Sequence, residues 1–357
     1  MLREAKRLAT VDALRLAAGC LVASALAACA AAPAGAPVPP ASVDALTQAM
    51  MRQPIVLLGE VHDNAAQHAL RAQALRRMVE QGARPAIAFE QFDREQQDAV
   101  ERLRREPGDT ATRVRRLIAA AGGRGWQWEL YRPYLALALD ENLPIVAANL
   151  SRPQAMRVAQ EGLGAVFDAQ QRAALGLDTI PQDVQRAQER EIEQGHCGRV
   201  PQEALPAMAL AQIARDAALA QAIEPYFDRG VVLLTGNGHA RRDIGVARHL
   251  SAPDRARTIT IGLLEDDDKA PGEAAYFDVA MRTPVQPRPD PCAHLAPMRI
   301  GTAEQPRPGL GRASTPLPSE PGALGGIQRE RQPDEAKADR LLRIEGLAKH
   351  ENPAQPL

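Results

Sequence analysis

The chain has 357 residues, a formal net charge of −1 and a hydrophobic fraction of 45%. This near-neutral charge excludes the basic surface on which nucleic-acid binding depends, so we expect no nucleic-acid partner. Only 3% of the residues are aromatic, so Leu, Val, Ile and Ala must fill most of the core. The residues up to about position 285 are enough for one large domain or two small ones.

Residues 1–28 have the three parts of a bacterial export signal: a basic start, a short apolar run and small residues at its end. The apolar run from Leu16 to Ala28, at about 13 residues, is shorter than the roughly 20 that a membrane-spanning helix needs. The run ends in Leu-Ala-Ala-Cys at positions 26–29, which resembles the lipobox of bacterial lipoproteins. We expect cleavage before Cys29 and acylation of that cysteine. The alternative is an ordinary cleaved signal with an incidental cysteine.

A lipid on Cys29 would hold the chain at a bilayer surface without spanning it. The Ala- and Pro-rich stretch 29–45 is then a tether between the lipid and the folded domain. The sequence thus predicts a lipid-anchored protein of the cell envelope that faces the periplasm or the cell surface.

Two further cysteines, Cys197 and Cys292, remain after such processing. In an oxidising envelope compartment two thiols commonly pair, so we predict a disulfide between them. Two free or metal-binding cysteines are the alternative, although neither belongs to a CxxC pair.

Short apolar runs bounded by turn residues alternate with helical patterns along the chain. The clearest runs are IVLL at 55–58, AIAF at 86–89, IVAA at 145–148, VVLL at 231–234 and ITI at 259–261. Continuous apolar runs of this kind are typical of strands buried on both faces. We therefore predict an α/β fold with a mostly parallel central sheet flanked by helices, and a final strand near 275–282.

The domain organisation follows from the same patterns. Residues from about 160 to 225 show only helical patterns, which we interpret as a helical insertion or lid on the α/β core. The folded domain is expected to cover residues 46–285. Residues 286–357 are rich in Pro, Gly, Glu and Arg, and such a composition buries too little surface to offset the entropy of ordering. We predict a disordered tail there.

Two similar motifs, Gly-Glu-Val-His at 59–62 and Gly-Asn-Gly-His at 236–239, follow predicted strands directly. A third predicted strand ends at Glu90. Because ligands of open α/β sheets bind at the carboxyl ends of the strands, we expect His62, Glu90 and His239 to face one crevice. These are suitable ligands for zinc or manganese, or could form a catalytic pair. The alternative is that each residue only caps a helix or satisfies loop backbone.

Other side chains near these motifs are candidates for binding a ligand. Arg241 and Arg242 could hold carboxylates of a ligand, or simply be solvated at a helix start. An aromatic cluster forms either a packing group or a wall against a flat apolar ligand, with a tyrosine oxygen available to iron. The cluster consists of Trp126, Trp128, Tyr131 and Tyr134. We expect His68, inside a predicted helix, to be a surface histidine.

The chain resembles the ChaN-type haem-binding lipoproteins, which belong to the wider Tiki/TraB and erythromycin-esterase-like superfamily. The resemblance rests on LLGEVHDN (57–64), AFEQFDREQ (88–96), PIVAANLSR (144–152), AQIARDAALA (211–220) and LLTGNGHARRDIGVARHL (233–250). These blocks run from about residue 54 to 262 and are specific together, although any one alone is weak.

The resemblance implies an α/β domain with a helical lid that binds haem in the cell envelope as part of iron acquisition. It implies an axial ligand among His62, His239, Tyr131 and Tyr134, and propionate contacts from arginines such as Arg241 and Arg242. Haem-uptake machinery is then a partner. A homodimer around stacked haems is compatible with the resemblance but has no support in the residues.

The same superfamily includes peptidases and esterases in which the two GxxH elements and the acidic residue are associated with metal-dependent hydrolysis. The alternative function is therefore a metallohydrolase in which His62, Glu90 and His239 hold a divalent metal such as zinc or manganese. That metal would lower the pKa of a bound water and make it a nucleophile. A third possibility is an envelope lipoprotein whose crevice is merely structural. We favour haem binding over an enzymatic activity.

Overall fold

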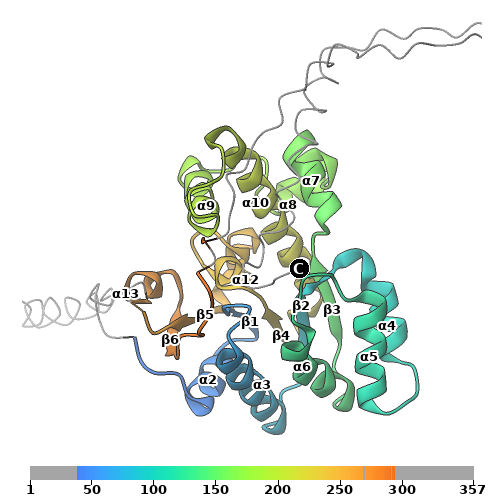
Figure 1. Ribbon diagram of the computed structural model, residues 1–357. Helices are drawn as coiled ribbons and strands as arrows, with labels where there is room; N and C mark the ends of the chain where they lie inside the picture. The colour runs from blue at the N-terminus through green and yellow to red at the C-terminus, as the bar shows by residue number, and fades with distance from the viewer. Residues whose placement is uncertain (1–37, 268–269, 291, 294–357) are drawn as a thin grey trace, which may run out of the picture. The chain divides into compact units, whose positions relative to one another are not determined.

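The computed structural model describes residues 38–267, 270–290 and 292–293 (Figure 1). The predicted export signal, Cys29 and the first part of the tether lie outside the described residues, as does the predicted tail from 294 onward. In the described part of the chain, no helix has both the length and the apolar character that crossing a bilayer requires.

All strands of the sheet are parallel, in the spatial order β3-β2-β4-β1-β5-β6. Their bounds are β1 Ile55–Leu58, β2 Ala86–Asp93, β3 Ile145–Asn149, β4 Val231–Leu234, β5 Thr258–Glu265 and β6 Val279–Thr283. The predicted α/β class with a parallel central sheet is confirmed. The final strand begins later than predicted, because residues 274–276 form a 3-10 turn.

Helices cover both faces of this sheet (Figure 1). On one face lie α2 (Val43–Met50), α3 (Ala65–Glu80), α4 (Gln97–Arg104), α5 (Thr110–Ala121) and α6 (Trp128–Asp140). The helical layer between β3 and β4 contains α7 (Arg152–Glu161), α8 (Ala169–Ala174), α9 (Gln182–Gly195) and α10 (Leu205–Ile223). This layer is the predicted helical insertion. Shorter helices follow: α11 (Asn237–Ala240), α12 (Ala252–Ala256) and α13 (Ala270–Glu273).

Successive side chains of each strand point to opposite faces, so each strand contributes to two hydrophobic cores. In β1, Val56 and Leu58 pack with α2, α3 and α6, whereas Ile55 and Leu57 pack with α10 on the other face. Burial on both faces explains why the sequence shows continuous rather than alternating apolar runs in these strands.

The folded unit is larger at both ends than the predicted range 46–285. Val38 is buried, and the backbone N–H of Ala41 donates to the carbonyl of Arg282 in β6. After β6, the Arg288 guanidinium binds the carboxylates of Asp63 and Glu265. The first residues of the predicted disordered tail are therefore held by ion pairs, which a Pro-rich composition does not reveal.

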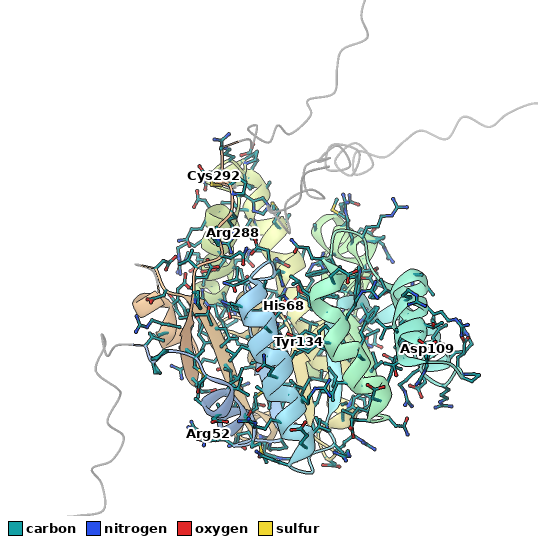
Figure 2. All side chains as sticks on the ribbon, turned by 60° about the horizontal axis from the view of Figure 1, so that its bottom comes forward. Arg52, His68, Asp109, Tyr134, Arg288 and Cys292 are labelled. Atoms are coloured by element: carbon teal, nitrogen blue, oxygen red, sulfur yellow. A yellow bond between two sulfur atoms is a disulfide. The ribbon has the colours of Figure 1, made fainter. Side chains whose placement is uncertain are left out.

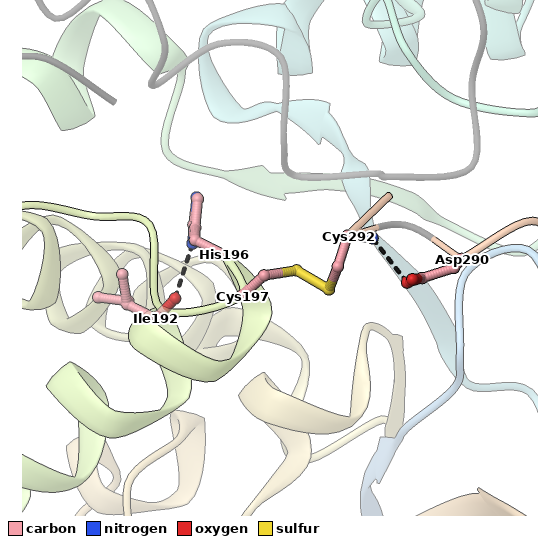
Figure 3. The surroundings of a disulfide bond; sticks show 5 residues. All are labelled: Ile192, His196, Cys197, Asp290 and Cys292. Atoms are coloured by element: carbon pink, nitrogen blue, oxygen red, sulfur yellow. Dashed lines mark hydrogen bonds between the residues drawn. A yellow bond between two sulfur atoms is a disulfide. The ribbon is translucent and has the colours of Figure 1, made fainter. Parts of the chain in front are cut away.

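Cys197 and Cys292, the two cysteines expected to pair, form a disulfide with their Cα atoms 5.8 Å apart (Figure 3). The bond joins the residue after the C-cap of α9 to the segment that Arg288 anchors (Figure 2). It closes a separation of 95 residues in sequence. The disulfide therefore ties the helical layer to the carboxyl end of the folded unit.

Candidate functional site

The register of the sheet brings the two GxxH motifs together. Leu58 at the end of β1 pairs with Leu234 at the end of β4, so the motifs leave the sheet at the same level. Two further backbone bonds join them: the N–H of Thr235 donates to the carbonyl of Leu58 at 3.2 Å, and the N–H of Asn237 donates to that of Glu60 at 2.9 Å. Both motifs therefore form one rigid unit at the carboxyl edge of the sheet.

Glycine is required where the two motifs meet. A Cβ on Gly236 would lie 2.9 Å from both Cε1 and Nε2 of His62, which is closer than van der Waals contact allows. A Cβ on Gly59 would likewise collide with the side chain of Asn237. Glycine at 236 therefore lets the imidazole of His62 approach the second motif, and glycine at 59 leaves room for the side chain of Asn237.

The ring of His62 is oriented by a buried carboxylate. Glu60 accepts a hydrogen bond from His62 Nδ1 at 2.9 Å, and it also accepts one from the hydroxyl of Tyr131. The guanidinium of Arg71, fully buried, forms an ion pair with the other oxygen of Glu60. Because an ionised carboxylate only accepts, Nδ1 of His62 carries the proton and the Nε2 of a neutral His62 keeps its lone pair.

A small polar network surrounds Glu60 and Arg71 within the core. Arg71 also donates to the carbonyl of Leu58 at 2.9 Å, and its guanidinium lies over the ring of Tyr134. His68 is buried rather than exposed, so the prediction of a surface histidine was wrong. The side chain of His68 contacts Tyr134 where α3 lies against α6 (Figure 2). Burial lowers the pKa of His68 to about 4, so this histidine is neutral at physiological pH.

His239 is held by a second buried carboxylate. Its Nδ1 lies 2.7 Å from Oδ1 of Asp216, which α10 carries, and Gln188 of α9 donates to the other oxygen of Asp216 at 3.1 Å. Burial opposes protonation of His239, but the charges of Asp216 and Glu90 outweigh it and raise its pKa to about 9. His239 is therefore a cation at neutral pH.

A third carboxylate, that of Glu90 at the end of β2, lies between the two imidazoles. Its Oε1 is 3.9 Å from Nε2 of His62 and 3.7 Å from Nε2 of His239. Its Oε2 accepts hydrogen bonds from the Thr235 hydroxyl at 2.6 Å and the Gly236 N–H at 2.8 Å. Burial by itself raises the pKa of Glu90. The nearby histidines and these hydrogen bonds have the larger effect and lower the pKa to about 2. Glu90 thus remains ionised.

These groups line a cavity of about 210 Å³, here called the histidine cavity. His62, Glu90 and His239 form its floor, and α9 and α10 contribute the opposite side, including Ile192 and Arg215. The ring of Trp126 packs edge-on against His62, with centroids 4.9 Å apart. The predicted convergence of the three residues on one crevice is therefore present.

Other predicted ligand-binding residues lie elsewhere. The hydroxyls of Tyr131 and Tyr134 bond to Glu60 and to the backbone of His68, and both rings are fully buried in the core. Of the aromatic cluster, Trp126 lines the histidine cavity, and the other three members pack in the core around it. The cluster is mainly a packing group.

Arg241 and Arg242 do not line the histidine cavity either. Arg241 binds the carboxylates of Asp243 and Glu191 and stacks on a tyrosine ring, with its Cζ 3.5 Å from the ring centroid. Arg242 is half exposed and pairs with Asp278 at 3.2 Å. Both guanidinium groups have carboxylate partners, but Arg241 also lines a cavity of about 300 Å³ that shares Glu191 and Gly238 with the histidine cavity. The role of these arginines toward a ligand stays a prediction.

The metal-binding hypothesis finds no support either. Within residues 38–267, 270–290 and 292–293, no three or more His, Cys, Asp or Glu side chains are grouped as a metal site requires. Instead, each Nδ1 of the two histidines is taken by a carboxylate, and Glu90 bonds to the second motif.

Several functional residues were missed by sequence reasoning. Asp216 and Arg215 lie side by side within α10, a helix otherwise made mostly of Ala, Leu and Ile. Glu60 lies within the first motif but was given no role of its own. Adjacent charges in an otherwise apolar helix were the available signal for Asp216 and Arg215, because buried charges require partners.

Comparison with known proteins identifies the family. Residues 46–250, more than half of the chain, match the family described as haem-binding uptake, Tiki superfamily, ChaN. The chain belongs to this ChaN family. The resemblance inferred from the sequence blocks is thereby confirmed, and the matched range of the ChaN domain includes His62, Glu90, Asp216 and His239.

One of the solved structures similar to this chain shows the same fold. A structure of ChaN from Campylobacter jejuni, described as binding haem cofacially, is 17% identical, covers 63% of this chain and 86% of its own, and has a TM-score of 0.52. The type III effector HopBA1 is 12% identical (71% and 99% covered, TM-score 0.39), and a mutant of the erythromycin esterase EreC is 14% identical (62% and 72%, TM-score 0.37). These two scores are too low to carry an argument. No curated protein matches the chain.

The raised pKa of His239 predicts a pH dependence of stability. Because the pKa in the folded protein, about 9, exceeds the ordinary 6.5, the stabilisation is complete below pH 6.5 and is lost as the pH rises through 9. In urea unfolding, the difference in free energy between the wild type and His239→Gln should shrink by up to about 3 kcal/mol between pH 6.5 and roughly 10.

The control is His249→Gln. Burial lowers the pKa of His249, so the corresponding difference should stay constant over the same range. A constant difference for His239→Gln as well would show that His239 is not protonated in the folded protein.

Proposed function

We propose that this ChaN-family protein binds haem in the histidine cavity and acts in haem uptake at the cell envelope. Two observations support the proposal: the haem-binding uptake family covers the site, and the Nε2 of His62 faces the cavity with its proton held on Nδ1. The second observation carries it, because an imidazole oriented by a carboxylate is the form in which histidine ligates a metal.

The cavity fits part of a porphyrin. Trp126, Ile192 and Ile244 supply aromatic and apolar lining, and Glu90 supplies a negative charge. Its volume of about 210 Å³ is below the roughly 300–1,000 Å³ of typical small-molecule sites. The porphyrin would therefore extend beyond the histidine cavity.

The two histidines have different roles in this proposal. Haem supplies an iron that accepts a nitrogen ligand. His62 is the residue that would hold it, because Glu60 binds its Nδ1 and the ring lines the histidine cavity. His239 is the cationic member of the pair: its Nδ1 is held by Asp216 and its Nε2 forms an ion pair with Glu90 at 3.7 Å, so we assign it the recognition of an anionic group. Glu60 and Asp216 are positioning residues that fix the two rings.

We keep haem binding ahead of metal-dependent hydrolysis. The hydrolytic alternative needs a metal held by His62, Glu90 and His239, and no three His, Cys, Asp or Glu side chains of the described residues are grouped to hold one. No specific observation on the described residues favours that alternative.

We also propose that the protein is a lipoprotein of the cell envelope, anchored through Cys29. The support is the sequence pattern of residues 1–29 together with the Cys197–Cys292 disulfide, because disulfides persist in oxidising compartments.

Haem binding is tested by titrating the full-length chain with haemin and following the Soret band. The wild type should bind one haem per chain, and His62→Ala should weaken binding at least tenfold because the iron loses its nitrogen ligand. His239→Ala should weaken it less. His249→Gln, outside the histidine cavity, is the matched control. The proposal fails if His62→Ala binds haem as the wild type does.

The anchor is tested by metabolic labelling with a palmitate analogue in a bacterial host. The wild type should carry the label and fractionate with membranes, whereas Cys29→Ser should be unlabelled because its side chain cannot form the thioether. Cys197→Ser is the control and should be labelled. An unlabelled wild type would contradict lipidation.

A further inference from the structure

A second, smaller cavity of about 70 Å³ adjoins the histidine cavity. The two share four lining residues: Ile192, His196, Gln212 and Arg215. The smaller cavity, here called the side slot, extends from these shared residues between α7 and α10. A flat ligand that fills the histidine cavity and continues past Ile192 therefore enters the side slot.

The side slot is mainly apolar because its helices contribute small or unbranched side chains. From α7 come Ala155, Met156 and Ala159, and from α10 come Met208 and Ala211. Alanine leaves the space between the two helices open, and methionine adapts to the shape of an apolar occupant. The slot therefore accepts a short apolar group.

Four polar residues also line the side slot: Arg152, His196, Gln212 and Arg215. Arg215 is buried and donates to the amide oxygen of Asn149 and to the carbonyl of Leu150, both at 3.1 Å. Arg152 is exposed, so its guanidinium is solvated. A carboxylate among the alanines and methionines would lose its hydration without sufficient compensation.

Building on the proposed function, we propose that the side slot selects which haem binds. The rim of the porphyrin enters it with short apolar groups, such as the vinyl and methyl substituents of protohaem. The carboxylate-bearing rim then lies outside the slot. The slot is thus a specificity subsite: it accepts iron porphyrins with an apolar edge and disfavours those with carboxylates on every edge.

The test compares three iron porphyrins on the full-length wild-type chain. Protohaem should bind about tenfold tighter than deuterohaem, which lacks the vinyl groups, because the unfilled slot loses their burial. Coprohaem, which has carboxylates on all sides, should bind at least tenfold weaker than protohaem. Equal affinities for protohaem and coprohaem would overturn the proposal, and so would equal affinities for protohaem and deuterohaem.

Filling the side slot provides the second measurement. Ala211→Leu should weaken protohaem binding about tenfold and deuterohaem binding much less, which reduces the preference between the two. Ala159→Leu on the facing helix should act in the same way. Ala169→Leu, on the exposed start of α8 and outside both cavities, is the control. An unchanged preference in both slot variants would overturn the proposal.

These results separate the two proposals. If the wild type binds none of the iron porphyrins, the proposed function fails. If it binds them all alike through His62, haem binding stands and the selection by the side slot is wrong.

Discussion

The site depends on the way three buried carboxylates hold two imidazoles. Glu60 binds Nδ1 of His62, Asp216 binds Nδ1 of His239, and Glu90 lies between the two Nε2 atoms. Each outer carboxylate fixes one ring and leaves its Nε2 toward the histidine cavity. The two rings differ in charge, because His239 is protonated at neutral pH. In the proposed function, His62 is the iron ligand and His239 is the cationic group beside Glu90.

Buried charges are costly, and the surrounding structure compensates each of them. Arg71 neutralises Glu60 from within α3, while the backbone N–H of Gly236 and the hydroxyl of Thr235 bond to Glu90. The parallel register places these donors correctly, since the strands that carry the motifs end at the same level. The disulfide and Arg288 then tie the helical layer and the first motif to one short carboxyl-terminal segment.

The sequence predicted the sheet and the convergence of His62, Glu90 and His239, because apolar runs and strand-end motifs are local signals. It did not predict the partners of these residues. Asp216 is 126 positions beyond Glu90 in sequence, and only packing of α10 on the sheet brings it to His239. Arg241, two residues after His239 in sequence, binds the carboxylates of Asp243 and Glu191. The sequence suggested this arginine as a ligand contact because it is close to His239 along the chain, but it could not reveal the carboxylates that bind it. The start of the fold at Val38 was likewise hidden by an Ala- and Pro-rich composition.

The central claim is that the Nε2 of His62 ligates iron while Glu60 holds its Nδ1 proton. A crystal structure of the full-length chain with haem, read at the iron absorption edge, tests it most directly. The account predicts anomalous density for one iron within coordination distance of Nε2 of His62, with the Glu60 contact retained. Iron bound to another residue, with His62 still turned toward Glu90, would contradict it.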